Sequence, residues 1–167
     1  GREYERWMQS LKNSTLTAFY TPVPVVYRLM HTIFHYGDMT PAKRFVPQTM
    51  LDPAAGMGIF GDMCVHVDHA CTNSVSVTCF EKDILTAMML KAKCNWKTAV
   101  YNDGFENFPK DELGMYDLVS TNVPFGDIPV YDAAFEKSGN PVRVAAQKMI
   151  HRYYVLKGLD CLRDGGL

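Results

Sequence analysis

The segment from Met50 to Phe60 carries the strongest local chemical signal, Met-Leu-Asp-Pro-Ala-Ala-Gly-Met-Gly-Ile-Phe. An apolar stretch ends in Asp52, and Gly56 and Gly58 then lead into a predicted helix. Glycine lets the backbone approach a ligand where a Cβ would clash. The carboxylate suits a cationic or hydroxyl-bearing ligand, because a phosphate loop would carry lysine or bare helix N–H groups instead. Taken alone, such a turn is also a common structural device.

Acidic residues follow the next two predicted strands. Glu81 comes after the strand over 75–80, where the edge of an α/β sheet binds ribose hydroxyls, since one carboxylate can accept from both. We assign Glu81 to this role and Asp83 to the N-cap of the following helix. After the next strand, Asp103 and Phe105 have the chemistry to bind and sandwich an adenine ring. A plain Asp-Gly turn explains the same residues equally well.

The fourth predicted strand ends in Ser-Thr-Asn-Val-Pro-Phe-Gly, residues 120–126. This segment resembles the Asn-Pro-Pro-Phe/Tyr signature of methyltransferases that act on planar, conjugated amino groups. Such an amine is a poor nucleophile, and the Asn122 side-chain oxygen and the Val123 carbonyl can each accept one of its N–H bonds. Phe125 supplies a face on which a base flipped out of the duplex can stack. Val123 replaces the family's usual proline, which removes φ rigidity but keeps the carbonyl.

A further matching segment, Thr17 to Val26, lies ahead of the predicted sheet. It resembles the Tyr-Thr-Pro segment of adenine-N6 DNA methyltransferases whose cofactor loop is amino-terminal. In that family the segment folds over the methionine moiety of the cofactor, which implies that Thr21 contacts it. Viewed alone, these residues are a helix N-terminus, with Thr21 as the cap and Pro22 in the first turn.

In their order along the chain, these motifs resemble the adenine-N6 DNA methyltransferase family of the Asn-x-Pro-Phe type. The resemblance runs from about residue 17 to the end, and residues 126–132 are similar to DNA methylases of bacterial mobile elements. It implies S-adenosylmethionine as the cofactor. The implied catalytic residues are Asn122, Val123, Pro124 and Phe125, and the implied cofactor-binding residues are Tyr20, Thr21, Asp52, Pro53, Ala54, Gly56, Gly58, Glu81, Asp103 and Phe105.

The implied activity is methyl transfer to adenine N6 in double-stranded DNA, as in restriction-modification, with DNA bound through regions outside this chain. One alternative is a catalytically inactive module that keeps the cofactor site. Another is methylation of a different conjugated amine, a glutamine side chain or guanine N2 in RNA. A third is a nucleotide-binding α/β domain such as half of a dehydrogenase. The missing third glycine and the Asn-x-Pro-Phe strand end oppose this third possibility.

Strands that alternate with helices predict an α/β domain with a parallel, doubly wound, Rossmann-like sheet. We divide the chain into an N-terminal helical segment with the cofactor-covering loop (1–40) and a partial methyltransferase domain (41–167). The turn at Gly165 and Gly166 predicts a further strand, so we expect a domain truncated after its fourth strand and helix. Predicted strands cover 48–51, 75–80, 98–101 and 116–121, and predicted helices cover 2–13, about 25–36, from about 57, 84–94 and about 142–162.

Composition narrows the remaining classes. The 167 residues are 47% hydrophobic, and no apolar run approaches the ~20 residues that a membrane-spanning helix requires. The five cysteines have no regular spacing, which favours reduced thiols and a cytoplasmic protein without membrane partners. A net charge of -1 gives no nucleic-acid signature and no pattern indicates an oligomeric state. The Cys-x-His-x-x-His-x-Cys run over 64–71 lacks zinc-finger spacing, so we predict no metal.

Overall fold

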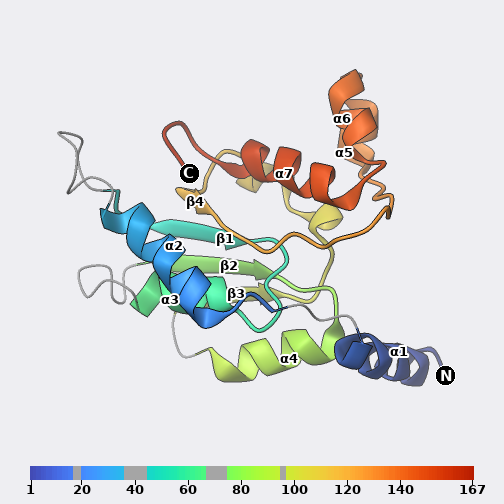
Figure 1. The fold of residues 1–167 in the computed structure, drawn as a ribbon. Helices are drawn as coiled ribbons and strands as arrows, with labels where there is room; N and C mark the ends of the chain where they lie inside the picture. Colours follow the sequence, from blue (N-terminus) through green and yellow to red (C-terminus); the bar gives the residue numbers. More distant parts are fainter. Residues whose placement is uncertain (17–19, 36–44, 67–74, 95–96) are drawn as a thin grey trace.

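A computed structural model describes residues 1–16, 20–35, 45–66, 75–94 and 97–167. Its centre is a sheet of four parallel strands in the order β3-β2-β1-β4 (Figure 1). The order runs outward in both directions from β1, which places a topological switch point between β1 and β4. Ligands of open α/β sheets bind beside the carboxyl ends of the strands at such a point. The strands are β1 (Thr49–Asp52), β2 (Ser76–Phe80), β3 (Thr98–Tyr101) and β4 (Leu118–Val119).

Helices cover both faces of the sheet, as the sequence predicts. Successive strand residues point to opposite faces, so Met50 joins one hydrophobic core and Leu51 the other. The first core packs β1 and β2 against α2, α3 and α4, and the second packs the opposite face against α7. The helices are α1 (Arg2–Leu16), α2 (Val23–His35), α3 (Ile59–His66), α4 (Ile84–Lys93), α5 (Ala133–Lys137), α6 (Pro141–Ala146) and α7 (Ile150–Cys161), with short 3-10 turns η2 (Phe105–Asn107) and η3 (Lys110–Glu112).

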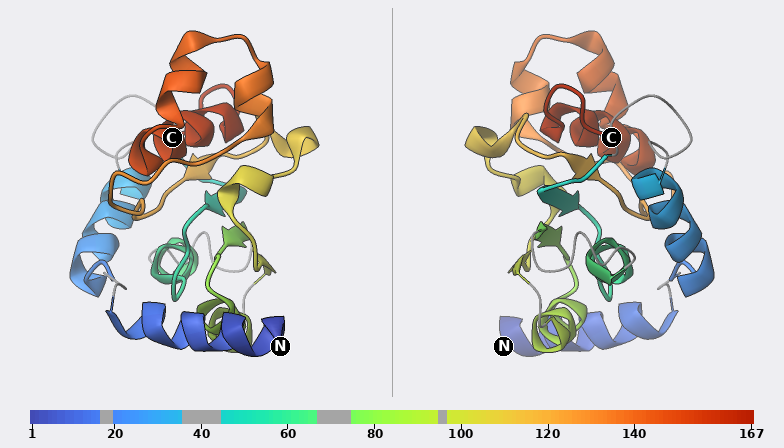
Figure 2. Two further views of the ribbon diagram at one scale, coloured as in Figure 1. Left: turned by 90° about the vertical axis from the view of Figure 1, so that its right-hand side faces the viewer. Right: turned by 90° about the vertical axis from the view of Figure 1, so that its left-hand side faces the viewer.

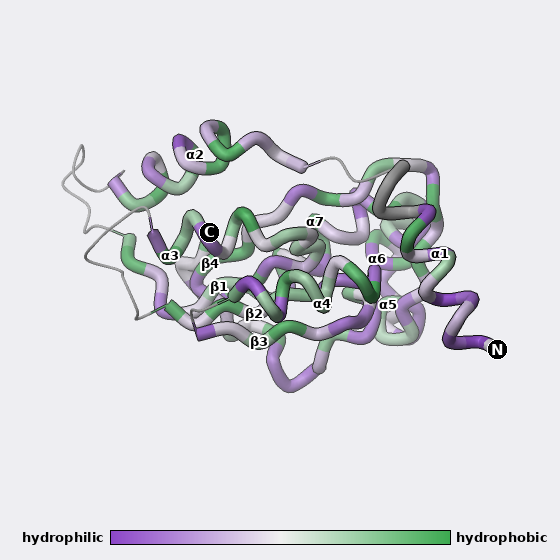
Figure 3. The backbone as a smooth tube through the Cα atoms, turned by 90° about the horizontal axis from the view of Figure 1, so that it is seen from below, coloured by the Kyte–Doolittle hydropathy of each residue, from purple (hydrophilic) through white to green (hydrophobic). Residues whose placement is uncertain are grey.

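The two N-terminal helices pack directly on this layered domain. α2 packs against α3, and α1 packs against α4. Both side views in Figure 2 show α1 running across α4, which is seen end-on. In Figure 3, α2 alternates between hydrophobic and hydrophilic residues, which is typical of a helix with one buried face. Its buried residues are Val26, Met30 and Phe34. None of the helices described here is long and apolar enough to cross a membrane.

The outer edge of β4 is partly paired by the last residues of the chain. Leu167 donates its N–H to the carbonyl of Asp117 at 2.9 Å and accepts from the N–H of Val119 at 2.8 Å. Leu162 also forms a parallel bridge with Tyr116. Gly165 makes the intervening turn with a φ of 78°. The chain therefore contacts this edge at residues 162–163 and again at Leu167, on either side of the turn.

The C-terminal third differs from the sequence prediction. The single helix predicted over 142–162 is two helices, α6 and α7, which are separated at residues 147–149. A tertiary contact explains the break, because the carbonyl of Gln147 accepts from Val130 N–H and its side-chain oxygen accepts from Asp132 N–H. The short helix α5 is not predicted by the sequence pattern. β4 spans two residues in place of the predicted 116–121.

Candidate functional site

A cavity of about 720 Å3 lies at the carboxyl ends of the strands. Segments that follow β1, β2, β3 and β4 all contribute to its walls, and one face of α1 completes it. This is the edge at which the strand order places a ligand site. The lining residues that enter the argument below are Arg6, Gln9, Ser10, Pro53, Ala54, Glu81, Lys82, Asp83, Asp103, Glu106, Pro124, Ile128, Pro129, Val130 and Tyr131.

The turn after β1 is built around two glycines in the left-handed region. Gly56 has a φ of 53° and Gly58 a φ of 77°, conformations that glycine adopts without steric cost. The Tyr20 ring lies against Gly56, only 3.3 Å from where a Cβ would stand. A Cβ on Gly58 would be 2.4 Å from the Leu90 side chain. The ring of Tyr20, a residue of the predicted loop, therefore lies against the glycine turn after β1.

Asp52, the last residue of β1, is fully buried beneath this turn. Its Oδ1 accepts a hydrogen bond from the N–H of Ala54 at 3.3 Å, whereas its Oδ2 has no hydrogen-bond partner. Burial raises the pKa of Asp52 to about 7, although the nearby Thr121 hydroxyl and the Ala54 N–H lower it. The Thr121 hydroxyl makes no well-formed hydrogen bond either. Asp52 therefore lies beneath the turn and is not among the residues that line the cavity, whereas its neighbours Pro53 and Ala54 are.

Glu81 follows β2 and lines the cavity. Its carboxylate accepts from Gly56 N–H at 2.8 Å and from Asp83 N–H at 2.7 Å, which ties the end of β2 to the glycine turn. Burial raises the pKa of Glu81, and these backbone hydrogen bonds oppose the rise. A carboxylate offers about four acceptor positions, so Glu81 retains capacity for ligand hydroxyls.

Asp83 is the N-cap of α4, as predicted, and it also fastens α1. Its carboxylate accepts from the Thr86 N–H at 2.9 Å and from the hydroxyl of Ser10 on α1. The Leu85 N–H in turn donates to the Ser10 oxygen at 3.3 Å. Ser10 is buried, and its neighbours Arg6 and Gln9 line the cavity. The sequence analysis missed this role of α1, because the helix shows only an amphipathic pattern.

The two residues predicted after β3 are separated by the fold. Asp103 lines the cavity, and its Oδ1 accepts from Gly104 N–H at 2.7 Å and from the Asn107 amide at 2.8 Å. Phe105, in contrast, is fully buried in the second core among aromatic rings, including Phe108. The prediction that Phe105 sandwiches an adenine ring is therefore corrected: the residue supports the wall from behind and does not line the cavity.

The Asn-Val-Pro-Phe segment leaves β4 beside the cavity. Pro124 lines it together with Pro53 and Ala54, so the β1 turn and the β4 exit share one wall. Asn122 is half-buried, and Phe125 is 68% exposed. Of the predicted catalytic segment, Pro124 thus lines the same cavity as Glu81 and Asp103.

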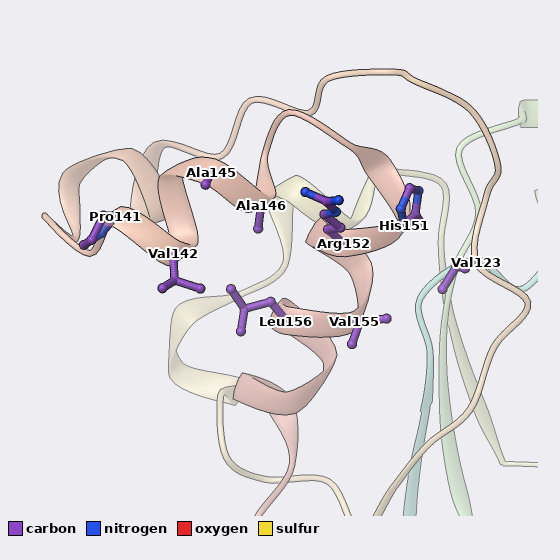
Figure 4. A pocket seen from close by; sticks show the side chains of 9 residues that line it. All are labelled: Val123, Pro141, Val142, Ala145, Ala146, His151, Arg152, Val155 and Leu156. Carbon is purple, nitrogen blue, oxygen red and sulfur yellow. The ribbon is translucent and has the colours of Figure 1, made fainter.

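A second, apolar cavity of about 730 Å3 lies on the other side of this segment. Val123 lines it, whereas its neighbour Pro124 lines the first cavity, so the motif stands between the two. Figure 4 shows the side chains of α6 and α7 that form its other walls. They are Pro141, Val142, Ala145, Ala146, His151, Arg152, Val155 and Leu156.

Comparison with solved structures identifies the fold. No protein-family model matches the sequence, and no curated protein matches it. Among solved structures, a putative class I S-adenosylmethionine-dependent methyltransferase from Listeria monocytogenes superposes with a TM-score of 0.67 at 14% identity, over 96% of this chain and 49% of that one. The chain has the fold of a class I S-adenosylmethionine-dependent methyltransferase.

Two further structures of this fold come from restriction systems. The modification subunit of a putative type I restriction enzyme from Vibrio vulnificus YJ016 has a TM-score of 0.64 at 17% identity, over 95% of this chain and 34% of that one. A type I restriction-modification methyltransferase subunit from Streptococcus thermophilus has a TM-score of 0.62 at 21% identity, over 89% and 33%. The chain therefore spans between a third and a half of the length of these three proteins.

The remaining predicted residues are described only in part by the structure. Thr21 is half-buried and lies two residues before α2 begins at Val23. The alternative with Thr21 as the helix cap and Pro22 in the first turn is therefore corrected, because Pro22 directly precedes the helix and Pro24 lies in its first turn. Residues 17–19 of the same loop lie outside the described residues, as do His69 and Cys71 of the run set aside as a zinc site. Within the part of the chain that is described, no group of three or more histidine, cysteine or acidic side chains is arranged to hold a metal ion.

Proposed function

We propose that this chain is the cofactor-binding and catalytic part of a methyltransferase that methylates adenine N6 in DNA. The observation that carries the proposal is the shared cavity, in which Pro124 of the Asn-Val-Pro-Phe segment lies with Glu81 and Asp103. Methyl transfer to a conjugated amine requires the cofactor site and the amine-binding motif to lie side by side.

The cavity residues fit S-adenosylmethionine. Its sulfonium group would supply an activated methyl group, and its positive charges suit the acidic walls of the cavity. Four acidic residues line the cavity, against two basic ones, Arg6 and Lys82, so the walls favour a cationic ligand. Glu81 would hold the ribose hydroxyls and Asp103 the adenine. The four acids are Glu81, Asp83, Asp103 and Glu106.

The proposed target site is the segment from Asn122 to Phe125. The Asn122 side-chain oxygen and the Val123 carbonyl would each accept an N–H bond of the target amine, which increases electron density on its nitrogen. The exposed face of Phe125 would stack on the planar ring that carries the amine. This chemistry needs neither a covalent nucleophile nor a metal.

Two observations favour DNA adenine over other conjugated amines. The Tyr-Thr-Pro segment resembles that of adenine-N6 DNA methyltransferases, and Tyr20 lies against the glycine turn. Two of the similar structures are methylation subunits of type I restriction systems. Since the chain spans about a third of each, we propose that DNA is bound through regions outside it.

The test is product analysis after incubation with S-adenosylmethionine and adenine-containing double-stranded DNA, on this chain and on a longer form of the protein. We expect N6-methyladenine, and we expect Asn122→Ala to abolish it while cofactor binding persists. Methylglutamine or N2-methylguanine with matching substrates would replace the DNA assignment by another amine. Cofactor binding with no transfer to any of these substrates would identify an inactive binding module.

A further inference from the structure

Lys157, on α7, is a buried cation that belongs to none of the sequence motifs described above. Its side chain is 6% exposed. The ammonium donates to Oδ2 of Asp132 at 2.6 Å and to the backbone carbonyl of Glu106 at 3.3 Å. It also lies over the ring of Phe105, 5.3 Å from the centroid. A cation is rarely buried unless its partners hold it.

The two oxygen partners belong to different walls of the cofactor cavity. Glu106 and Asp103 line it from the segment after β3, which we call the β3 wall (residues 103–107). Asp132 ends the segment after β4, which we call the β4 wall (residues 124–132) and which lines the cavity through Pro124 and four residues from Ile128 to Tyr131. One ammonium therefore joins walls that come from the opposite outer strands of the sheet.

The Asp132 end of this connection is firmly held. Its Oδ1 accepts from Ala134 N–H at 2.7 Å as the N-cap of α5, and its Oδ2 also accepts from the Tyr153 hydroxyl at 2.8 Å. Its own N–H donates to the side-chain oxygen of Gln147 at 2.7 Å. Burial acts to raise the pKa of Asp132, but hydrogen bonds from Lys157 and Tyr153 hold it below its ordinary value.

The β4 wall is otherwise exposed between its ends. Phe125, Ile128 and Tyr131 are 68%, 54% and 72% exposed. At the β4 end, Ser120 N–H donates to the carbonyl of Leu51 at 3.1 Å, and at the far end Val130 N–H donates to Gln147. The intervening residues are thus held at both ends, by Ser120 on one side and by Val130 and Asp132 on the other.

We propose that Lys157 is a positioning residue whose ammonium sets the spacing between the β3 wall and the β4 wall. This spacing would fix the position of the Asn-Val-Pro-Phe segment relative to the cofactor site. Lys157 acts through Glu106 and Asp132 and touches no reacting group. That the spacing matters for methyl transfer rests on the proposed function, but the spacing itself can be tested without any ligand.

The first test is amide hydrogen exchange, followed by mass spectrometry, on the ligand-free protein and two variants. Lys157→Met removes the ammonium but leaves Asp132 buried without it, so the double variant Asp132→Asn/Lys157→Met removes both charges, which buried pairs tolerate better. Arg143→Gln is the matched control, because Arg143 pairs with Asp160 at 2.7 Å between α6 and α7 and touches neither wall.

We expect exchange of the hydrogen-bonded amides in segments 103–107 and 124–132, above all those of Asn107, Val130 and Asp132, to rise about tenfold or more in both variants, the usual effect of losing a charged hydrogen bond. Peptides of α4 and the control variant should match the wild type. Acceleration of one wall only, or uniform acceleration over all peptides, would overturn the proposal. If Lys157→Met does not fold, the double variant decides.

The second test is calorimetric titration with S-adenosylhomocysteine, in which the stoichiometry reports the folded fraction. We expect Kd to rise about tenfold in the variants at unchanged stoichiometry, with the Arg143→Gln value unchanged. An unchanged Kd in the variants would contradict the positioning role. Absence of binding by the wild type would instead count against the proposed function, while the exchange result would still decide the connection between the walls.

Discussion

The proposed cofactor side of this site, formed by the segments after β1 and β2, and the proposed target side, formed by the segment after β4, are built differently. After β1 and β2, backbone hydrogen bonds hold the site together, since the Glu81 carboxylate accepts from Gly56 and Asp83 and the Phe80 carbonyl accepts from Ala55 N–H at 2.9 Å. After β4, the wall is anchored at its ends and presents exposed apolar side chains, with Phe125 at 68% and Tyr131 at 72% exposure.

This contrast suits the two sides to different ligands. A preorganised pocket suits a cofactor that returns in every reaction cycle, because little ordering is required at each binding event. An exposed aromatic segment suits a target that arrives from outside the chain and covers apolar surface when it binds. Substitutions on the two sides should therefore separate cofactor binding from methyl transfer.

The largest separation is expected for Asn122→Ala on the target side. Loss of one preorganised polar group at the reacting centre typically lowers kcat by about 100-fold to 1,000-fold. The Kd for S-adenosylmethionine should stay within about twofold, because Asn122 is not among the residues that line the cavity. Single-turnover transfer and calorimetry measure the two quantities, and equal loss in both would assign Asn122 to the cofactor side.

Asp52 provides a pH-dependent comparison on the cofactor side. Its pKa is raised from 3.8 to about 7, so its contribution to stability is present below about pH 4 and is lost as pH rises through 7. Asp52→Asn cannot ionise, so the variant should gain on the wild type over this range by a few kcal/mol, at about 1.4 kcal/mol per pKa unit. Urea unfolding at pH 4 to 8 measures this difference, and parallel curves for the two proteins would contradict the shift.

We expect Glu81→Gln to weaken binding of the cofactor without preventing the protein from folding. The Glu81 carboxylate accepts from two backbone N–H groups and is proposed to bind the ribose hydroxyls, so its replacement should raise Kd for S-adenosylmethionine by about 10-fold to 100-fold. Glu106→Gln is the control, since Glu106 lines the same cavity but pairs with the exposed Lys82 at 2.9 Å. Similar Kd changes in both variants would indicate general electrostatics and not a specific ribose contact.

The smallest effect is expected in the glycine turn. Gly56→Ala places a Cβ in the left-handed region and 3.3 Å from the Tyr20 ring, whereas Gly139→Ala has a similar φ and no atom within 4 Å. Both variants should lose roughly 1–2 kcal/mol of stability from backbone strain. Only Gly56→Ala should also displace Tyr20 and weaken cofactor binding, and equal binding by both variants would show that Tyr20 does not close the site.

Much of the cofactor side could be predicted from the sequence because its signals are local. The strand, the acidic residue and the glycine turn are consecutive. The alternation of strands and helices predicts that Asp52, Glu81 and Asp103 all lie at the carboxyl ends of the strands, where Glu81 and Asp103 line the cavity. The Asn-Val-Pro-Phe segment was placed by the same rule, because it follows the next strand.

The features that were missed depend on contacts distant in sequence. Gln147 breaks the predicted helix over 142–162 because it binds Asp132, and no helix-ending residue marks the position. Phe105 is buried because other aromatic rings surround it, which a local Asp-Gly-Phe pattern does not indicate. The role of Lys157 and that of Ser10 likewise arise only when α7 and α1 pack against other elements.

The most direct measurement is calorimetric titration of S-adenosylmethionine into the wild-type protein, with NAD titrated in parallel. We expect one binding site for S-adenosylmethionine, weakened by Glu81→Gln and little affected by Asn122→Ala, and no comparable binding of NAD. Binding of NAD in preference to S-adenosylmethionine, or no binding of S-adenosylmethionine by this chain or a longer form of the protein, would contradict the methyltransferase assignment.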